Sequence, residues 1–142
     1  MGDIQIRKVQ SDRELDAIFG IRHEVFVVEQ NVDPTLEYDE FEETSHHFIA
    51  LRDELPVGTA RWRRTPNGIK LERFAVLSDH RNQGVAAGLI RTILDDLPNQ
   101  SNVYLHAQVQ VCALYRKFGF VEEGDEFIEA DIRHYKMSYR PV

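Results

Sequence analysis

The stretch from residue 69 to residue 98 changes from a strand pattern to a helix pattern across a short segment that contains a glycine. In "IKLERFAV" (69–76), apolar and polar residues alternate, which is typical of a strand. After "HRNQG" (80–84), apolar residues recur at helical spacing until Pro98. The apolar positions of this helix are Val85, Leu89, Ile90, Ile93, Leu94 and Leu97. A strand that leads into a helix requires a sheet with a helix on its face.

The first half of the chain predicts strands around one long helix. "IQIRKV" (4–9) alternates like a strand, and Ser11 with Glu14 forms a capping box that opens a helix. One side of that helix carries Leu15, Ile18, Phe19, Arg22 and Phe26. A short second helix is expected near Pro34. "HHFIALRD" (46–53) and "PVGTARWRRT" (56–65) predict two strands, and Asn67-Gly68 predicts an antiparallel hairpin to the strand that follows.

The second half predicts a strand, a short helix and a final pair of strands. "NVYLHAQV" (102–109) is typical of a buried strand. In "VCALYRKFGF" (111–120), we expect a helix with Val111, Leu114 and Phe118 on its inner face and Gly119 at its end. Residues 120–129 and 132–140 alternate like strands. This order predicts a mixed sheet with helices on its faces.

Length and composition indicate one domain, residues 1–142, because 142 residues suit a single core. No apolar run approaches the roughly 18 residues of a membrane span, and the first residues lack an apolar signal core. Cys112 is the only cysteine, so no internal disulfide is expected. These features favour the cytoplasm. His46 and His47 are adjacent in a strand and point to opposite faces, so we expect no metal site.

The negative charge is concentrated in one segment. The net charge is −7, and residues 24–43 contain eight acidic residues and no Lys or Arg. A basic stripe typical of nucleic-acid binding is absent from the sequence, so we expect no nucleic-acid partner. The segment is either a solvated acidic loop or a negative field that gathers a cationic ligand.

The loop before the second long helix has the features of an anion site. Backbone N–H groups at a helix N-terminus are unpaired, and the helix dipole adds positive charge there. Gly84 allows a positive φ, and the small residues after it let a diphosphate approach the backbone. An ordinary helix start packed on the sheet is the alternative. The spacing fits neither a P-loop nor the dinucleotide-binding fingerprint, so a phosphate site here would serve another cofactor.

The pattern Arg81-x-x-Gly84-x-Ala86 resembles the signature of the GNAT superfamily of N-acetyltransferases. The preceding strand "KLERFAV" and the downstream "ALYRKFGF" are also similar to that family. "VFVVEQNV", "HAQ" and "DIRHYKM" resemble the narrower ElaA/YjcF type of small bacterial acetyltransferase, in which Gly-Ile-Pro-His is usual where this chain has Asp131-Ile132-Arg133-His134. The resemblance implies an α/β (α+β) fold with a GNAT-like mixed, mostly antiparallel central sheet and helices on both faces.

The resemblance implies acetyl-CoA as co-substrate and assigns residues to it. The loop would hold the pyrophosphate through Arg81, Asn82, Gln83, Gly84, Val85, Ala86 and Ala87. The pantetheine arm would pair with the backbone of Phe74, Ala75 and Val76, between two strands that splay apart. A backbone N–H there would hold the oxyanion. Tyr115 would bind the coenzyme and protonate the leaving thiolate; a tyrosine that merely packs beneath the helix is the alternative.

Glu72 ranks first as the general base, because period two places it on one face with Phe74 and Val76. An ion pair with a neighbouring arginine is its alternative role, and no dedicated base is a further one. Glu29 and His134 follow as bases. The acceptor side would be lined by Glu29, Gln30, Gln108 and His134.

The predicted function is transfer of an acetyl group from acetyl-CoA to an amine acceptor, a small molecule or a protein, by a monomer or homodimer that does not bind membranes. The acidic segment favours a cationic acceptor. The alternatives are a non-catalytic acyl-CoA-binding sensor and, with less support, a nucleotide-binding domain.

Overall fold

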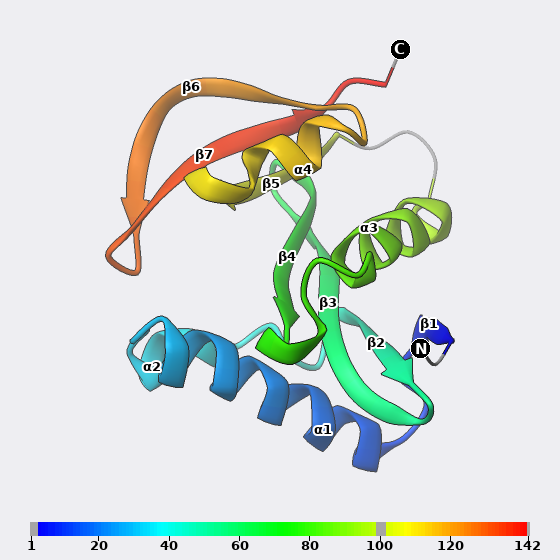
Figure 1. Cartoon of the computed structure of the whole chain (residues 1–142). Helices are drawn as coiled ribbons and strands as arrows, with labels where there is room; N and C mark the ends of the chain where they lie inside the picture. The colour runs from blue at the N-terminus through cyan, green and yellow to red at the C-terminus, as the bar shows by residue number, and fades with distance from the viewer. Residues whose placement is uncertain (1–2, 99–101, 142) are drawn as a thin grey trace.

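The computed structural model describes residues 3–98 and 102–141, which form a seven-stranded sheet in the order β1-β2-β3-β4-β5-β7-β6 (Figure 1). Every pair of neighbouring strands is antiparallel except β4 and β5, which are parallel. The predicted mixed, mostly antiparallel sheet is therefore confirmed. The strands are β1 (Ile4–Lys8), β2 (His46–Arg52), β3 (Leu55–Thr65), β4 (Gly68–Val76), β5 (Val103–Gln108), β6 (Phe120–Glu129) and β7 (Ile132–Tyr139).

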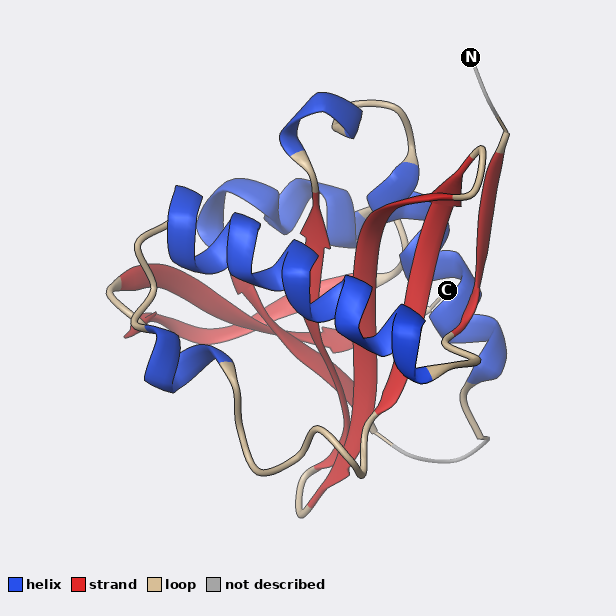
Figure 2. Cartoon of the chain, turned by 90° about the horizontal axis from the view of Figure 1, so that it is seen from below, coloured by secondary structure: helices blue, strands red, loops and turns tan. Residues whose placement is uncertain are grey.

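Helices cover both faces of this sheet (Figure 2). The long helix α1 packs its Ile18 on Ile49 of β2, whereas Leu89 of α3 belongs to the cluster that contains Phe48. Because neighbouring residues of a strand point to opposite faces, α1 and α3 lie on opposite sides. The helical segments are α1 (Asp12–Arg22), η1 (His23–Glu29), α2 (Pro34–Glu37), η2 (Ser78–His80), α3 (Val85–Asp96), η3 (Val109–Val111) and α4 (Cys112–Arg116).

The main core lies between the sheet and the α3–α4 side. The predicted apolar face of α3 supplies four fully buried side chains, and Leu94 and Leu97 pack against them at the edge. The predicted hairpin at Asn67-Gly68 joins β3 to β4, with Thr65 opposite Gly68. Ser11 caps α1 as predicted, and its Oγ accepts a hydrogen bond from the backbone N–H of Glu14 at 3.2 Å.

The inner face of α4 differs from the prediction. Cys112 and Tyr115 are its buried residues, whereas Val111 is 37% exposed. Leu114 and Phe118 pack only at the edge of the core. A 3₁₀ turn (Val109–Val111) carries the chain out of β5, so the helix begins one residue later than expected. In a helix of five residues, that turn sets the phase more strongly than the apolar period does.

The helix that follows β1 changes its type halfway. Residues 23–29 form a π-helix, in which the N–H of Gln30 bonds to the carbonyl of Val25 at 3.2 Å. The next residue, Asn31, has a positive φ of 58° and ends the helix. A π-helix turns less per residue than an α-helix, so the predicted alignment of Phe26 with the apolar face of α1 does not extend through it.

Strand β4 contains a bulge at Arg73, whose φ of 58° is positive. Across from it the register with β3 shifts, so that Arg61 pairs with Glu72 and Thr59 pairs with Ala75. The extra residue reverses the alternation of the strand. Glu72 therefore does not share a face with Phe74 and Val76, which pack into the main core on the α3–α4 side. The period-two argument for Glu72 is wrong because it assumed an unbroken strand.

The turn that starts β4 supports a test of the fold. Gly68 has a φ of 130°, and a Cβ added there would lie 2.3 Å from the backbone oxygen of Asn102. We expect Gly68→Ala to lower the free energy of unfolding by about 2 kcal/mol or more, since a backbone position must shift. Urea denaturation measures the change.

Gly20→Ala is the matched control, because a Cβ at Gly20 in α1 meets no atom within 4 Å. It should raise stability by about 0.5–1 kcal/mol, as expected for glycine in a helix interior. Equal effects of the two substitutions would contradict the strained turn at Gly68.

Candidate functional site

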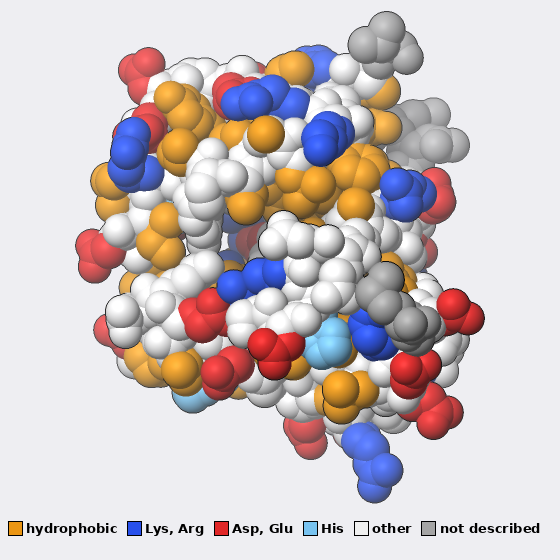
Figure 3. Space-filling view, viewed as in Figure 1, with side chains coloured by type: hydrophobic (Ala, Val, Ile, Leu, Met, Phe, Trp, Pro, Cys, Tyr) orange, Lys and Arg blue, Asp and Glu red, His pale blue; other side chains and the backbone are white. Residues whose placement is uncertain are grey.

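Strands β4 and β5 form a fork. They pair only over Ile69–Leu71 and Val103–Leu105 and separate beyond that point, as the family resemblance implied. The space between them opens into a cleft of about 850 Å³, seen in Figure 3 as a hollow with charged side chains inside it. Its walls come from η1, α2, β4, the start of α3, β5, α4 and the β6–β7 turn.

The start of α3 closes one end of the cleft with backbone rather than side chains. Gly84 is the N-cap with a φ of 84°, and no side chain caps the helix. The first turn therefore directs unpaired N–H groups outward, which suits an anion. Of the predicted loop residues, those that line the cleft are Arg81, Asn82, Gly84, Val85, Ala86 and Ala87. Gln83 does not; its amide donates to the carbonyl of Asp79 at 3.4 Å.

Arg81 joins this loop to both neighbouring elements. Its Nε donates to the carbonyl of Val76 at 2.8 Å, at the end of β4. Its two terminal nitrogens donate to the carboxylate of Glu29 at 2.9 and 2.7 Å. Glu29, predicted on the acceptor side, does not line the cleft and instead ties η1 to the loop.

Tyr115, the predicted proton donor to the leaving thiolate, lies on α4 and lines the cleft. It is 6% exposed and packs edge-on against Phe74, with ring centroids 5.6 Å apart. Burial raises the pKa of Tyr115 well above its usual value. The phenol therefore keeps its proton near neutral pH, which suits hydrogen-bond donation better than complete proton transfer.

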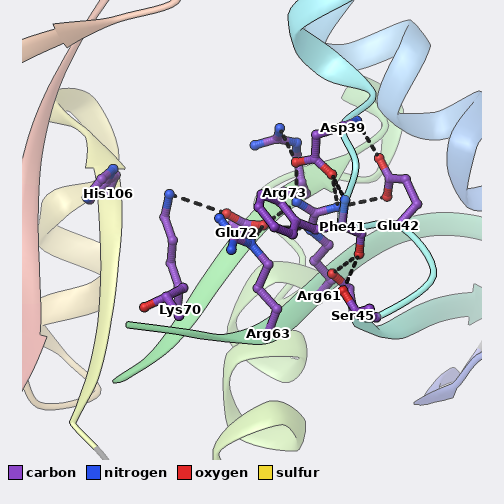
Figure 4. Close-up of polar contacts among 12 residues, drawn as sticks. Asp39, Phe41, Glu42, Ser45, Arg61, Arg63, Lys70, Glu72, Arg73 and His106 are labelled. Carbon is purple, nitrogen blue, oxygen red and sulfur yellow. Dashed lines mark hydrogen bonds and ion pairs between the residues drawn. The ribbon is translucent and has the colours of Figure 1, made fainter. Parts of the chain in front are cut away.

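Glu72 is held by three cations (Figure 4). Its Oε2 accepts from Nε of Arg61 at 2.7 Å, from a second nitrogen of Arg61 and from Nε of Arg63 at 2.8 Å, and its Oε1 lies 3.3 Å from Nζ of Lys70. Burial raises the pKa of Glu72, but the cations, Arg61 first, outweigh it and lower the pKa to about 2. So weak a base favours the ion-pair role over the general-base role.

Glu72 belongs to a larger charge network of nine residues joined by ion pairs. Arg22 and Arg61 are each 1% exposed and connect most of its carboxylates. The network consists of Arg22, Glu37, Asp39, Glu42, Arg61, Arg63, Lys70, Glu72 and Arg73. It fixes α2 and the segment after it against β3 and β4, and so holds one wall of the cleft.

The acidic segment of the sequence supplies three of these residues, Glu37, Asp39 and Glu42. Arginines neutralise them, and Arg81 neutralises Glu29. The charged residues that line the cleft are balanced in number. They are Arg63, Lys70, Arg73 and Arg81 against Glu37, Asp39, Glu72 and Glu129. The acidic segment therefore does not give the cleft an excess of negative charge. The prediction of a cationic acceptor, which rested on that excess, is no longer supported.

His134 lines the opposite wall, on β7. Its Nδ1 lies 2.7 Å from the carbonyl oxygen of Ile132, so Nδ1 carries the hydrogen and donates it. In the neutral ring, Nε2 is then left with its lone pair. The carboxylate of Glu129 lies 3.8 Å from Nε2 and also accepts a hydrogen bond from His106 at 3.1 Å.

Gln30 and Gln108, both predicted on the acceptor side, bridge the two walls of the cleft. The amide of Gln108, at the end of β5, donates to Oε1 of Gln30 at 2.9 Å. Gln110 donates to Gln108 in turn at 2.7 Å. These amides are polar and uncharged, so they can orient a ligand without fixing its charge.

Sequence reasoning missed several residues of the cleft, among them Lys70, Arg73, His106 and Glu129. Lys70 had a usable signal, since it lies two positions before Glu72 in a regular part of β4 and so shares its face. Arg73 had no such signal, because the alternation of apolar and polar residues in β4 does not reveal the bulge that orients its side chain. Glu129 comes to the cleft only through the β6–β7 turn.

Across residues 3–98 and 102–141, no group of three or more His, Cys, Asp or Glu side chains could hold a metal ion. No helix in that same part of the chain is long and apolar enough to cross a membrane.

Comparisons with known proteins point to one family. The sequence profile described as "Acetyltransferase (GNAT) domain" matches residues 8–141. The chain is 39% identical over 132 residues to the uncharacterized N-acetyltransferase YjcF of Bacillus subtilis, covering 90% of this chain and 94% of YjcF.

Solved structures agree with this result. An acyl-CoA N-acyltransferase from Pseudomonas aeruginosa is similar with 30% identity and a TM-score of 0.80, covering 98% of this chain and 99% of that one. ElaA of Escherichia coli has the same fold, with 24% identity and a TM-score of 0.81, and the match covers 99% of this chain and 100% of ElaA.

The ion pairs of Glu72 should make the free energy of unfolding depend on pH. The pKa falls from 4.5 to about 2 on folding, so the stabilisation is complete above pH 4.5 and is lost as the pH falls towards 2. We expect Glu72→Gln to lower the free energy of unfolding by about 3 kcal/mol at pH 7. The difference from the wild type should shrink below pH 4.5, as measured by urea titrations at several pH values.

Glu126→Gln is the control, because Glu126 pairs with Arg133 on the surface outside the network. It should change stability little at any pH. A Glu72→Gln difference that stays constant down to pH 3 would contradict a charged Glu72.

Proposed function

The chain belongs to the GNAT acetyltransferase family, and on that premise we propose that it transfers the acetyl group of acetyl-CoA directly to an amine acceptor. One observation carries the proposal. The fork between β4 and β5 opens onto a helix start whose backbone N–H groups line the same cleft. A long anionic thioester fits such a groove at both ends, with its phosphates at the helix and its acyl group at the fork.

The loop residues are proposed to bind the diphosphate through backbone donors. Gly84, Ala86 and Ala87 leave room for the phosphates, and the helix dipole adds positive charge. The pantetheine arm would pair with the backbone of Phe74–Val76, because beyond Leu71 the β5-facing edge of β4 has no strand partner among the described residues.

The acceptor amine is proposed to attack the thioester without a covalent enzyme intermediate. A backbone N–H of β4 near the bulge would stabilise the developing oxyanion, and positioning in the cleft would supply much of the acceleration. Tyr115 would donate a hydrogen bond to the departing sulfur. Its raised pKa supports this role, because the phenol remains a donor over the working pH range.

His134 replaces Glu72 as the proposed proton acceptor. An amine must lose a proton to form an amide, and the Nε2 lone pair of neutral His134 is left free by the hydrogen bond of Nδ1 to Ile132. Glu129, 3.8 Å from Nε2, would stabilise the imidazolium that forms. Glu72 would instead hold the wall of the cleft through its ion pairs.

A thiol-release assay tests the proposed function. Protein, acetyl-CoA and a panel of amines are mixed, and free coenzyme thiol is measured against blanks without amine. We expect amine-dependent release for at least one class of amine. Tight acetyl-CoA binding without release would favour the non-catalytic acyl-CoA-binding alternative.

Ala87→Glu tests the diphosphate site. Ala87 lies in the first turn of α3, where a glutamate suits the helix but repels phosphate. We expect the Kd for acetyl-CoA to rise by about tenfold or more, measured by calorimetry. Thr92→Glu on the same helix, away from the cleft lining, should leave the Kd nearly unchanged. Equal Kd values for both variants would remove the diphosphate from this loop.

His134→Gln tests the proton acceptor. We expect kcat to fall by about a hundredfold and the acidic limb of the kcat/KM profile to flatten, while the Kd for acetyl-CoA stays unchanged. His106→Gln is the comparison variant, since that ring also lines the cleft and its Nδ1 donates to Glu129; a larger fall in kcat for His106→Gln would assign the proton to His106 instead. An acidic limb that persists in His134→Gln would assign the proton to another group.

A further inference from the structure

The charge network places Arg63, Lys70 and Arg73, together with Glu37, Asp39 and Glu72, in the wall of the cleft. It contains five basic and four acidic residues, so it carries a positive surplus. The side chains of Glu37 and Glu72 are buried, at 1% and 6% exposed, whereas Asp39 is 23% exposed and pairs with Arg61 and Arg73. The cleft-lining side chains of Lys70 and Arg73 are 14% and 24% exposed.

Among the cations of the network, Lys70 makes the fewest polar and cation–π contacts. Its Nζ has one ion pair, 3.3 Å from Oε1 of Glu72. That same carboxylate already neutralises Arg61 and Arg63. Arg61 also pairs with Asp39 and Glu42, whereas Arg63 and Lys70 share Glu72 as their one carboxylate in the described part of the chain, so a further anion beside Lys70 would be stabilised. In Figure 4, Lys70 projects between Glu72 and the strand that carries His106.

The opposite wall carries the complementary group. Glu129 lines the cleft with a side chain that is 46% exposed, next to His134 and His106. The hydrogen bond from His106 lowers the pKa of Glu129, and the charge of Lys70 on the facing strand lowers it further. The cleft therefore has a cationic side at β4 and an anionic, proton-accepting side at the β6–β7 turn.

We propose that the acceptor of the acetyl group is an amine that also carries an anionic group, a carboxylate or a phosphate, near its amino group. Lys70 binds the anion, and the amine lies against His134 and Glu129. The proposal rests on the proposed function and specifies its substrate class. An amine without the anion leaves the surplus at Lys70 unbalanced and lacks one of its two anchors, so it reacts more slowly.

Matched pairs of acceptors test this class. Each pair differs only in the anion: the L-amino acids and their decarboxylated amines, and O-phosphoethanolamine with ethanolamine. Initial rates of thiol release give kcat/KM for each member. We expect the anionic member of the reactive pair to be at least about tenfold better, and the two series distinguish carboxylate from phosphate.

Lys70→Met keeps the aliphatic stem and removes the charge. It should raise KM for the best anionic acceptor by about tenfold or more, with little change for its anion-free partner. Lys70→Arg should restore most of the affinity. Lys8→Met is the matched control, since Lys8 is 49% exposed on β1 and pairs with Asp96 away from the cleft. A merely structural Lys70 would change both members of a pair alike.

The outcomes separate this proposal from the proposed function. Thiol release with anion-free amines only, or an equal effect of Lys70→Met on both members of a pair, overturns the acceptor class and leaves the acetyltransferase intact. Absence of release with every amine of both series also overturns the acceptor class. The proposed function falls only if polyamines and lysine peptides, assayed alongside, give no release either.

Discussion

The site depends on the limited pairing of β4 with β5. After Leu71, β4 continues for five residues while β5 turns away, and the sheet opens instead of closing. Unpaired backbone in a strand is costly unless a ligand or water satisfies it. The bulge at Arg73 adds to this effect, because it breaks the alternation at the fork and sends Glu72 and Phe74 to opposite faces. The same strand therefore contributes Glu72 to the charge network on one face and Phe74 to the main core on the other.

The charge network explains why the acceptor wall keeps its place. Residues 33–45 form only one short helix and bury few apolar side chains, so hydrophobic packing alone would hold them weakly. Buried ion pairs add little net stability, yet leaving one partner alone is expensive. Arg22 and Arg61 therefore mainly fix the position of residues 33–45 against the sheet, because both guanidinium groups must keep their hydrogen bonds to carboxylates of this segment.

The sequence predicted those features that depend on short-range patterns. The helix with Val85 and Leu89, the hairpin at Gly68 and the glycine-led helix start each follow from local spacing. The failures share a physical cause. The bulge at Arg73, the π-helix after Arg22 and the 3₁₀ turn that sets the phase of α4 are each a departure of the backbone from its regular period, which a periodicity argument assumes to be unbroken. The face of Glu72 was misjudged for the same reason, since the bulge turns Phe74 and Val76 to the opposite face, although an ion pair with a neighbouring arginine was among its predicted roles.

The double anchoring of Arg81 links the two ends of the cleft thermodynamically. Its guanidinium holds the end of β4 through Val76 and holds η1 through Glu29. Gln30, the residue directly after η1, bonds to Gln108 on the far wall. An anion that draws Arg81 away from Glu29 weakens the hold on η1, so its binding energy is shared with the arrangement of the opposite wall. Linkage makes any such coupling reciprocal, so a ligand that orders the acceptor side would change the affinity at the helix start by the same factor.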